Sequence, residues 1–219
     1  MISSKSEDNG LALLTDADLN IYSIGVSTAG VAEIRMVEQN PNCKVIATSI
    51  DVEGLETTKK LIEEKGYSNR IALKLEDISK PLPYEDNYFD YVYARLVLHY
   101  LDKHQQTKAL REIHRVLKQG SMLFIVVRST NNSDALNNLD SKDPQTGITT
   151  FPVRTPELRQ KEKFRRRYFH TPNTLREFIE SAGFLIVEEK VYMERLAGDF
   201  ERRIISDEDD ELIEMVCVK

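Results

Sequence analysis

Residues Ile21–Gly30 read IYSIGVSTAG, and their pattern is the strongest indication of architecture in the chain. An apolar run ends in a series of small residues, and a helical pattern begins directly after them. Because glycine tolerates positive φ and has no side chain, backbone N–H groups in such a turn can approach a ligand. Open α/β sheets build nucleotide sites in this way, at the carboxyl ends of their strands. The stretch therefore predicts a strand, a ligand-binding turn and a helix.

Length and composition restrict the class of protein. The chain has 219 residues, 41% hydrophobic and 30% charged, which is typical of one globular domain with a sizeable core. A net charge of −6 argues against a dedicated nucleic-acid binder. No apolar run approaches the ~20 residues of a membrane span. The N-terminus MISSKSEDNG lacks a signal-peptide pattern. Cys43 and Cys217 form neither a disulfide framework nor a metal-binding spacing, which favours a cytoplasmic protein.

Strand-like and helix-like segments alternate along the chain. We expect strands at Asn20–Gly25, Lys44–Ile50, Arg70–Leu75, Asp90–Ala94, Ser121–Arg128, Phe184–Val191 and Leu212–Val218. We expect helices at Val31–Gln39, Asp51–Gly66, Gln105–Lys118 and Thr174–Ala182. This alternation predicts an α/β fold with a doubly wound, mostly parallel seven-stranded sheet and helices on both faces. Because Tyr192–Glu211 shows no clear crossover helix, the last two strands are predicted to form an antiparallel hairpin.

One long segment has little predicted secondary structure. Ser129–Pro156 is rich in Asn, Asp, Ser, Thr, Pro and Gly, and it follows the fifth strand. Long loops at the carboxyl end of a strand are commonly functional. With the basic run KEKFRRRYFH at Lys161–His170, it makes 129–170 a candidate substrate-side insertion or lid. We expect a single domain over 1–219, with 1–19 as an N-terminal segment.

Three further stretches, together with the first, carry a family resemblance. They are Leu75–Leu101 (LEDISKPLPYEDNYFDYVYARLVLHYL), Glu112–Val126 (EIHRVLKQGSMLFIV) and Arg167–Glu189 (RYFHTPNTLREFIESAGFLIVEE). In this order they resemble the strands, turns and helices of class I S-adenosylmethionine (SAM)-dependent methyltransferases, over roughly residues 20 to 219. The resemblance implies a Rossmann-like fold, SAM as cofactor and methyl transfer. Because one fold hosts many functions, it bears more directly on fold than on reaction.

The resemblance assigns cofactor contacts to the first turn, where the family motif is substituted. Gly25 would let the backbone approach the carboxypropyl part of SAM, and a plain strand-ending turn is the alternative. Ser23 stands where the family has an acid that helps to hold the SAM amino group. Serine supplies no charge, and charge-assisted hydrogen bonds are the stronger ones. Ser27 and Ala29 stand where the family has glycines, and each Cβ would crowd the ligand path.

The end of the second strand is substituted as well. The family has an acid there that grips the ribose hydroxyls. This position falls on Ser49, with Ile50 next to it for packing on the adenine. Asp51 follows two residues later, where capping the next helix is the favoured role. A different register would make Asp51 the ribose ligand, so both assignments stay open.

The third and fourth strands match the family more closely. The resemblance implies that Asp77 accepts from the adenine amino group and that the backbone N–H of Ile78 donates to the ring. The alternative is that Asp77 caps a turn before Pro81. Ala94 and Arg95 close the fourth strand, where relatives line the pocket beside the transferred methyl group. Arg95 is alternatively a surface or packing residue.

Candidate substrate residues follow the fourth and fifth strands. His99, in LVLHYL, is a candidate catalytic base, although a lone histidine in an apolar stretch is more often packed. The basic run Lys161–His170 has a solvated helix or loop face as its default interpretation. Its arginines and aromatics would alternatively form an anion-binding wall or stack on a nucleobase. We therefore take Arg128, Arg167 and Tyr168 as candidate substrate residues.

Methyl transfer from SAM to a small or medium-sized acceptor is the leading functional prediction. The sulfonium activates the methyl group, so alignment carries much of the rate. A base is needed only for an acceptor that must lose a proton. No metal-ligand cluster is visible in the sequence, so we expect no metal. The alternative is a methyltransferase-like protein with weak or no activity and a binding or regulatory role, because the first motif is substituted. An RNA-directed enzyme rests on the basic run alone.

Overall fold

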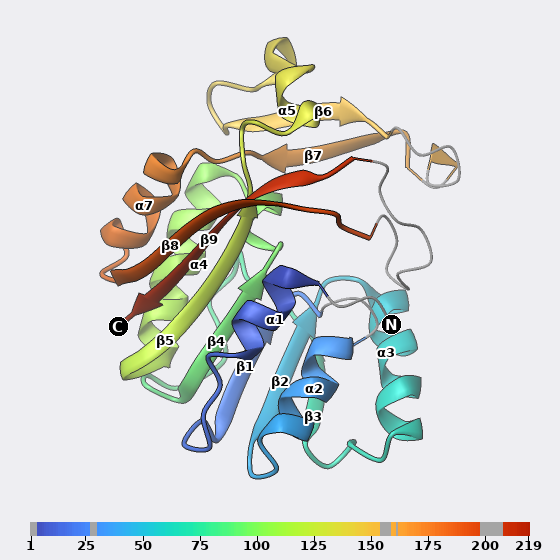
Figure 1. Ribbon diagram of the computed structural model, residues 1–219, viewed down its shortest axis with the longest axis vertical. Coiled ribbons are helices and arrows are strands. Elements are labelled where there is room, and N and C mark those ends of the chain that lie inside the picture. Colours follow the sequence, from blue (N-terminus) through green and yellow to red (C-terminus); the bar gives the residue numbers. More distant parts are fainter. Residues whose placement is uncertain (1–3, 27–29, 154–158, 161, 198–207) are drawn as a thin grey trace.

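A seven-stranded sheet in the order β3-β2-β1-β4-β5-β9-β8 forms the centre of the protein (Figure 1). The structure is a computed structural model that describes residues 4–26, 30–153, 159–160, 162–197 and 208–219. The strands are β1 (Asn20–Ile24), β2 (Lys44–Ser49), β3 (Ile71–Leu75), β4 (Phe89–Arg95), β5 (Leu117–Arg128), β8 (Leu185–Glu194) and β9 (Asp210–Val218). β1 to β5 pair in parallel, and β9 pairs antiparallel with β5 and β8. The predicted fold class, including the terminal hairpin, is confirmed.

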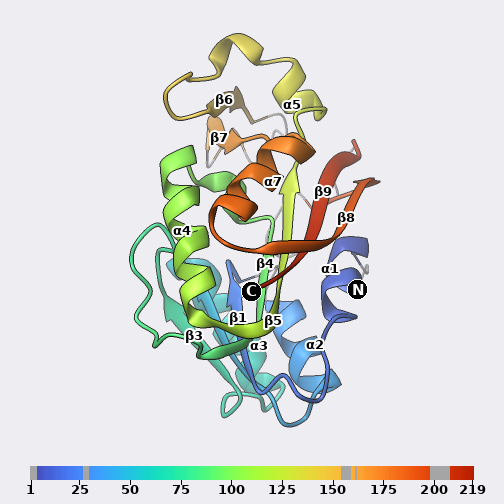
Figure 2. The same cartoon turned by 90° about the vertical axis from the view of Figure 1, so that its left-hand side faces the viewer.

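Helices cover both faces of this sheet (Figure 2). The main ones are α1 (Lys5–Leu11), α2 (Val31–Gln39), α3 (Val52–Glu64), α4 (Lys103–Val116) and α7 (Pro172–Ser181). α4 and α7 pack on one apolar core, and α1, α2 and α3 pack on the other. α4 illustrates why: Ala109, Ile113 and Val116 recur at helical spacing, and all three are buried. The two cores hold the sheet between them and fix where its strand ends lie.

The start of α4 and of β5 differs from the predicted boundaries. Asp102 caps the helix, because its carboxylate accepts from the backbone N–H of Gln105 and the Gln105 side chain accepts in return. At the other end, the predicted helix continues to Lys118, but Leu117 already pairs with Phe89 of β4. Strand pairing therefore ends the helix early.

The N-terminal helix α1 has no counterpart in the sequence-based prediction. Its short segment carries polar residues, and their partners come from distant parts of the chain. Glu7 is completely buried and forms an ion pair of 2.7 Å with Arg35 of α2. The backbone N–H of Ser6 donates to Glu194 of β8 at 2.9 Å. Tertiary contacts therefore stabilise this helix, as is usual for short helices.

Residues 129–153 are more ordered than the predicted loop. They form α5 (Ser133–Leu136), η3 (Leu139–Ser141) and β6 (Ile148–Pro152). β6 pairs antiparallel with β7 (Phe164–Tyr168) in a separate two-stranded sheet. Within the basic run, Phe164–Tyr168 form a strand, so the predicted helix or loop is wrong there, although Phe164 and Arg166 are exposed to solvent. Figures 1 and 2 show the small sheet beyond the carboxyl ends of β4 and β5.

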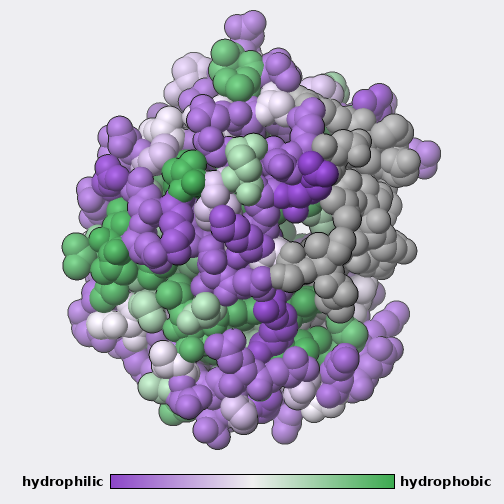
Figure 3. All heavy atoms as spheres, viewed as in Figure 1, coloured by the Kyte–Doolittle hydropathy of each residue, from purple (hydrophilic) through white to green (hydrophobic). Residues whose placement is uncertain are grey.

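The surface shows one apolar concentration on the face of Figure 3. Hydrophilic side chains prevail on that face, and apolar side chains gather at the edge where β8 begins. Leu185 and Val187, at the start of β8, are both exposed. No helix among the residues that the structure describes is long and apolar enough to cross a membrane.

Candidate functional site

The turn after β1 requires glycine for two separate reasons. Gly25 has φ of +72°, and a Cβ at this position would lie 2.8 Å from Cγ2 of Val97. Gly30, the residue before α2, has φ of +76°, and a Cβ there would lie 2.5 Å from Cγ2 of Thr58. The two ends of the turn are therefore tightly constrained. Ser27 and Ala29, which crowd the ligand path in the sequence-based prediction, lie outside the described residues.

A buried carboxylate lies at the end of β1, and it comes from the helix. The hydroxyl of Ser23 donates to Oε1 of Glu33 at 2.5 Å, and both residues are completely buried. Glu33 lies in the first turn of α2, where the helix dipole stabilises a negative charge. Sequence reasoning missed this residue. The available signal was an acid between Ala32 and Ile34 on an apolar helical segment.

At the end of β2, the two candidate ribose ligands, Ser49 and Asp51, differ in their hydrogen bonds. The hydroxyl of Ser49 accepts the backbone N–H of Asp51 at 3.0 Å. Asp51 occupies the N-cap position of α3, as predicted, but its side chain makes no capping hydrogen bond within the described chain. Its carboxylate is exposed. Beside it, Ile50 and Leu75 are 73% and 65% exposed on adjacent strand ends. A free carboxylate therefore stands next to two exposed apolar side chains.

Asp77 makes the hydrogen bond expected of a residue that caps a turn, which is the alternative to its cofactor role. Its Oδ1 accepts the backbone N–H of Ser79 at 2.9 Å, and the side chain is exposed. Ile78 is buried in the core under α4. Just before them, Glu76 accepts hydrogen bonds from the hydroxyls of Tyr22 and Tyr84, which ties the end of β3 to β1.

At the end of β4 the structure favours the packing role of Arg95. Its guanidinium donates to the hydroxyls of Ser4 and Ser6 at 2.6 and 2.7 Å, and it lies 3.6 Å from the carboxylate of Glu194. Ala94 is completely buried. Leu96 follows in the left-handed region with φ of 55°, a conformation that costs a non-glycine residue about 1–2 kcal/mol. Such strain is concentrated at functional sites.

His99 lies on the short helix η2 (Leu98–Tyr100), directly after this turn. Its side chain is buried, and its Nδ1 has no hydrogen-bond partner among the residues described. Burial lowers its pKa well below the usual value, and the charges of Arg167 and Arg128 act in the same direction. His99 is therefore neutral at neutral pH. It is packed, as its alternative role predicts, yet it lies near enough to two of the predicted substrate residues for their charges to act on it.

Arg167, on β7, lies against η2. Its guanidinium carbon is 4.3 Å from the ring centroid of Tyr100 and 5.9 Å from that of Phe151. Burial lowers its pKa. Tyr168 points from the opposite face of the strand, where its ring contacts His170 and Phe178. Arg167 therefore belongs to the group around His99, whereas Tyr168, on the other face of β7, touches that group only through His170.

Arg128 and His170 complete this group. Arg128 forms an ion pair with Asp210 of β9. The backbone N–H of His170 donates to the carbonyl of Arg128 at 3.0 Å, which places His170 at the end of β5. Sequence reasoning missed His170, which burial keeps neutral by lowering its pKa to about 3. We call Arg128, Arg167, His99 and His170 the arginine–histidine cluster.

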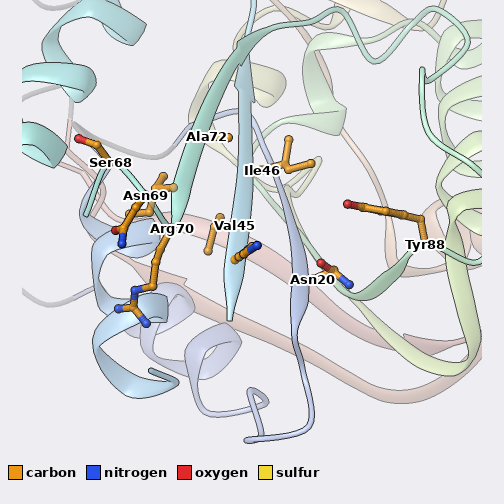
Figure 4. A pocket seen from close by; sticks show the side chains of 10 residues that line it. Asn20, Val45, Ile46, Ser68, Asn69, Arg70, Ala72 and Tyr88 are labelled. Atoms are coloured by element: carbon orange, nitrogen blue, oxygen red, sulfur yellow. The ribbon is translucent and has the colours of Figure 1, made fainter. Parts of the chain in front are cut away.

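A separate hollow lies at the opposite edge of the sheet, at the amino ends of β1, β2 and β3 (Figure 4). Arg70 lines it, but its guanidinium donates to the backbone carbonyls of Val37 and Asn40 at 2.5 and 3.3 Å. None of the predicted site residues lines this hollow. Over the described ranges, no group of three or more His, Cys, Asp or Glu side chains could hold a metal ion.

Comparisons with known proteins agree with the fold. Residues 23–125 match a family model described as a methyltransferase domain. No curated protein matches the chain. A SAM-dependent methyltransferase from Methanosarcina mazei is 19% identical, with a TM-score of 0.77 over 100% of this chain and 99% of its own. The [4+2]-cyclase SpnF is 17% identical, with a TM-score of 0.66 over 97% and 79% of the two chains. A putative S-adenosylmethionine-dependent methyltransferase from Listeria monocytogenes is 15% identical, with a TM-score of 0.70 over 98% of both.

Proposed function

We propose that the chain is a class I SAM-dependent methyltransferase, which its match to a methyltransferase domain over residues 23–125 and its fold support, and that it transfers a methyl group from SAM to a small or medium-sized acceptor. The observation that carries this proposal is the buried Ser23–Glu33 pair beside Gly25. The hydrogen bond from Ser23 offsets part of the cost of burying this carboxylate at the strand end. It stands near the position where the resemblance implies an acid for the SAM amino group.

The residues at the strand ends fit SAM. Glu33 supplies the carboxylate that Ser23 lacks. Asp51 is the better ribose ligand, because its carboxylate is exposed while the Ser49 hydroxyl is engaged by the backbone. Ile50 and Leu75 present apolar surface for the adenine.

Three further contacts complete the cofactor proposal. Asp77 and the backbone of Ile78 are assigned to the adenine edge, and Ala94 to the pocket wall. Arg95 is left out of the set, because its guanidinium is occupied by Ser4, Ser6 and Glu194. The methyl acceptor approaches from the side of η2 and of the β6–β7 sheet, which we assign as the substrate-side lid.

When bound, SAM supplies an electrophilic methyl group on its sulfonium centre. The residues of the chain hold the two reactants in line, which is where most of the rate enhancement in such a transfer arises. Gly25 allows close approach of the backbone. His99 is neutral, and its free Nδ1 is available to accept a hydrogen bond or a proton from the acceptor.

Calorimetric titration with S-adenosylhomocysteine tests this function. We expect saturable binding by the wild-type protein. No heat at millimolar ligand would overturn the proposal and leave the binding or regulatory role. The similarity to a [4+2]-cyclase illustrates that one fold carries different functions.

A further inference from the structure

Among the residues that the structure describes, Arg167 is a buried cation without an ion-pair partner. The residue is 6% exposed, and the one hydrogen bond that its guanidinium makes within the described ranges is long, 3.4 Å from Nη1 to the carbonyl of Arg166. No carboxylate of the described chain lies within ion-pair distance of it. Burying an unpaired guanidinium is strongly unfavourable, so a fold retains one only when something else compensates it.

Several polar atoms of the other three residues of the cluster are buried and unsatisfied. Nε of Arg128, Nδ1 of His99 and both ring nitrogens of His170 are buried without hydrogen-bond partners among the described residues. A neutral imidazole carries one N–H donor, and each guanidinium carries several. The guanidinium groups of Arg128 and Arg167 are donors only, so the cluster offers an oxyanion more donors than acceptors, although one ring nitrogen of each neutral histidine, Nδ1 of His99 included, accepts.

The net charge of the cluster indicates which kind of oxyanion it would bind. Arg128 and Arg167 carry positive charges, and Asp210, which pairs with Arg128, carries a negative one. Asp134 and Arg165 act on Arg167 from farther away and with opposite signs. Lys142 acts on His170 from outside the cluster. Within the cluster, Arg167 carries the one charge that has no ion pair among the described residues, which matches a carboxylate better than a phosphate dianion. The aromatic faces of Tyr100 and Phe151 flank the planar guanidinium, whose edge suits bidentate binding of a carboxylate.

We propose that the arginine–histidine cluster binds the carboxylate of the methyl acceptor, so that the acceptor is a small carboxylic acid. The assignment of this carboxylate to the acceptor rests on the proposed function. Arg167 anchors the carboxylate, and the lone pairs it engages are unavailable for attack, so the methyl group goes to another atom of the acceptor. η2 follows β4 directly, which places the anchor at the same edge of the sheet as the Gly25 turn (Figure 1).

The test uses the full chain without cofactor and three small probes. Benzoate carries the carboxylate, benzamide is its uncharged counterpart, and phenyl phosphate is the competing oxyanion. Binding is measured by calorimetry for the wild type, Arg167→Met and Arg166→Met. Arg166 is the matched control, because it is exposed on the same strand and loses the same charge.

We expect benzoate to bind the wild type and Arg166→Met equally, and Arg167→Met at least tenfold more weakly. Benzamide should not bind. Without any probe, Arg167→Met should melt a few degrees higher than the wild type, because it removes an unpaired buried charge. A lower melting temperature would assign Arg167 a purely structural role.

The other possible results also test the proposed carboxylate site. Absent benzoate binding, equal binding by Arg167→Met, or tighter binding of phenyl phosphate each overturns the carboxylate site. The titration with S-adenosylhomocysteine does not involve Arg167. Benzoate binding without binding of that cofactor product would therefore remove the methyltransferase function while keeping the anion site.

Discussion

Ser23 and Glu33 share a hydrogen bond of 2.5 Å at the carboxyl end of β1, and neither side chain reaches solvent. The serine occupies the strand position where the family resemblance implies an acid, and the glutamate approaches the same place from the first turn of α2. Because the strand and the helix are joined by a short turn, a carboxylate on either element reaches this point.

Substitution of Glu33 tests whether this carboxylate serves the cofactor. Glu33→Gln should weaken S-adenosylhomocysteine binding roughly 10- to 100-fold, as expected for loss of a hydrogen bond to a charged group worth about 1.5–3 kcal/mol. Calorimetry measures the dissociation constant directly. Glu38→Gln is the matched control, since Glu38 is exposed on the same helix. Unchanged affinity of Glu33→Gln in a folded protein would exclude the cofactor contact.

The Gly25 turn should be sensitive to a single methyl group. Gly25→Ala adds the strain of positive φ and a contact of 2.8 Å with Val97. Gly66 has φ of +76°, but no atom lies within 4 Å of the place that a methyl group would take, so Gly66→Ala isolates the backbone cost, about 1 kcal/mol. We expect Gly25→Ala to cost about 1–3 kcal/mol more. Urea unfolding measures both, and equal costs would show that the contact with Val97 relaxes freely.

The Arg95–Glu194 pair should control the stability of α1. Both side chains are largely buried, so Glu194→Ala leaves the Arg95 charge without its partner. Such a loss costs about 3–5 kcal/mol, which lowers the melting temperature by roughly 6–20 °C. Asp209→Ala breaks the exposed pair with Arg195 and should cost less than about 1 kcal/mol. Similar melting temperatures for the two variants would contradict the structural role of the buried pair.

Stability should fall in acid because of His170. Burial lowers its pKa from 6.5 to about 3 in the folded protein. Between these values the unfolded chain binds a proton that the folded protein does not, so stability is complete above pH 6.5 and decreases as the pH falls. The slope from this group reaches about 1.4 kcal/mol per pH unit.

His170→Gln should flatten that dependence, measured as the free energy of unfolding from pH 7 to pH 4.5. His104→Gln is the control, because His104 is exposed at the start of α4. If both variants keep the wild-type slope, His170 is not the titrating group. His99, whose pKa is also lowered, accounts for part of the slope that remains.

Several elements of this protein follow from local pattern. Periodicity and turn residues predicted the seven strands of the main sheet and the helices α2, α3, α4 and α7, because amphipathic spacing and helix stops act over a few residues. The same reasoning missed α1 and β6, since their stability comes from contacts with distant residues. Glu7 needs Arg35, and β6 needs the strand β7 beside it.

The candidate site shows the same difference between what local pattern predicts and what tertiary contacts decide. Ser23 in place of an acid is visible in the printed sequence, but Glu33 compensates for it only once α2 packs back on β1. The sequence by itself does not distinguish the three consecutive arginines Arg165–Arg167, because each carries the same charge. Pairing with β6 makes the segment a strand, and alternation of its side chains buries Arg167 while Arg166 stays exposed. Local pattern therefore accounts for the sheet and its ligand edge, and long-range packing accounts for which charges are buried there, because burial depends on neighbours that lie far away in the chain.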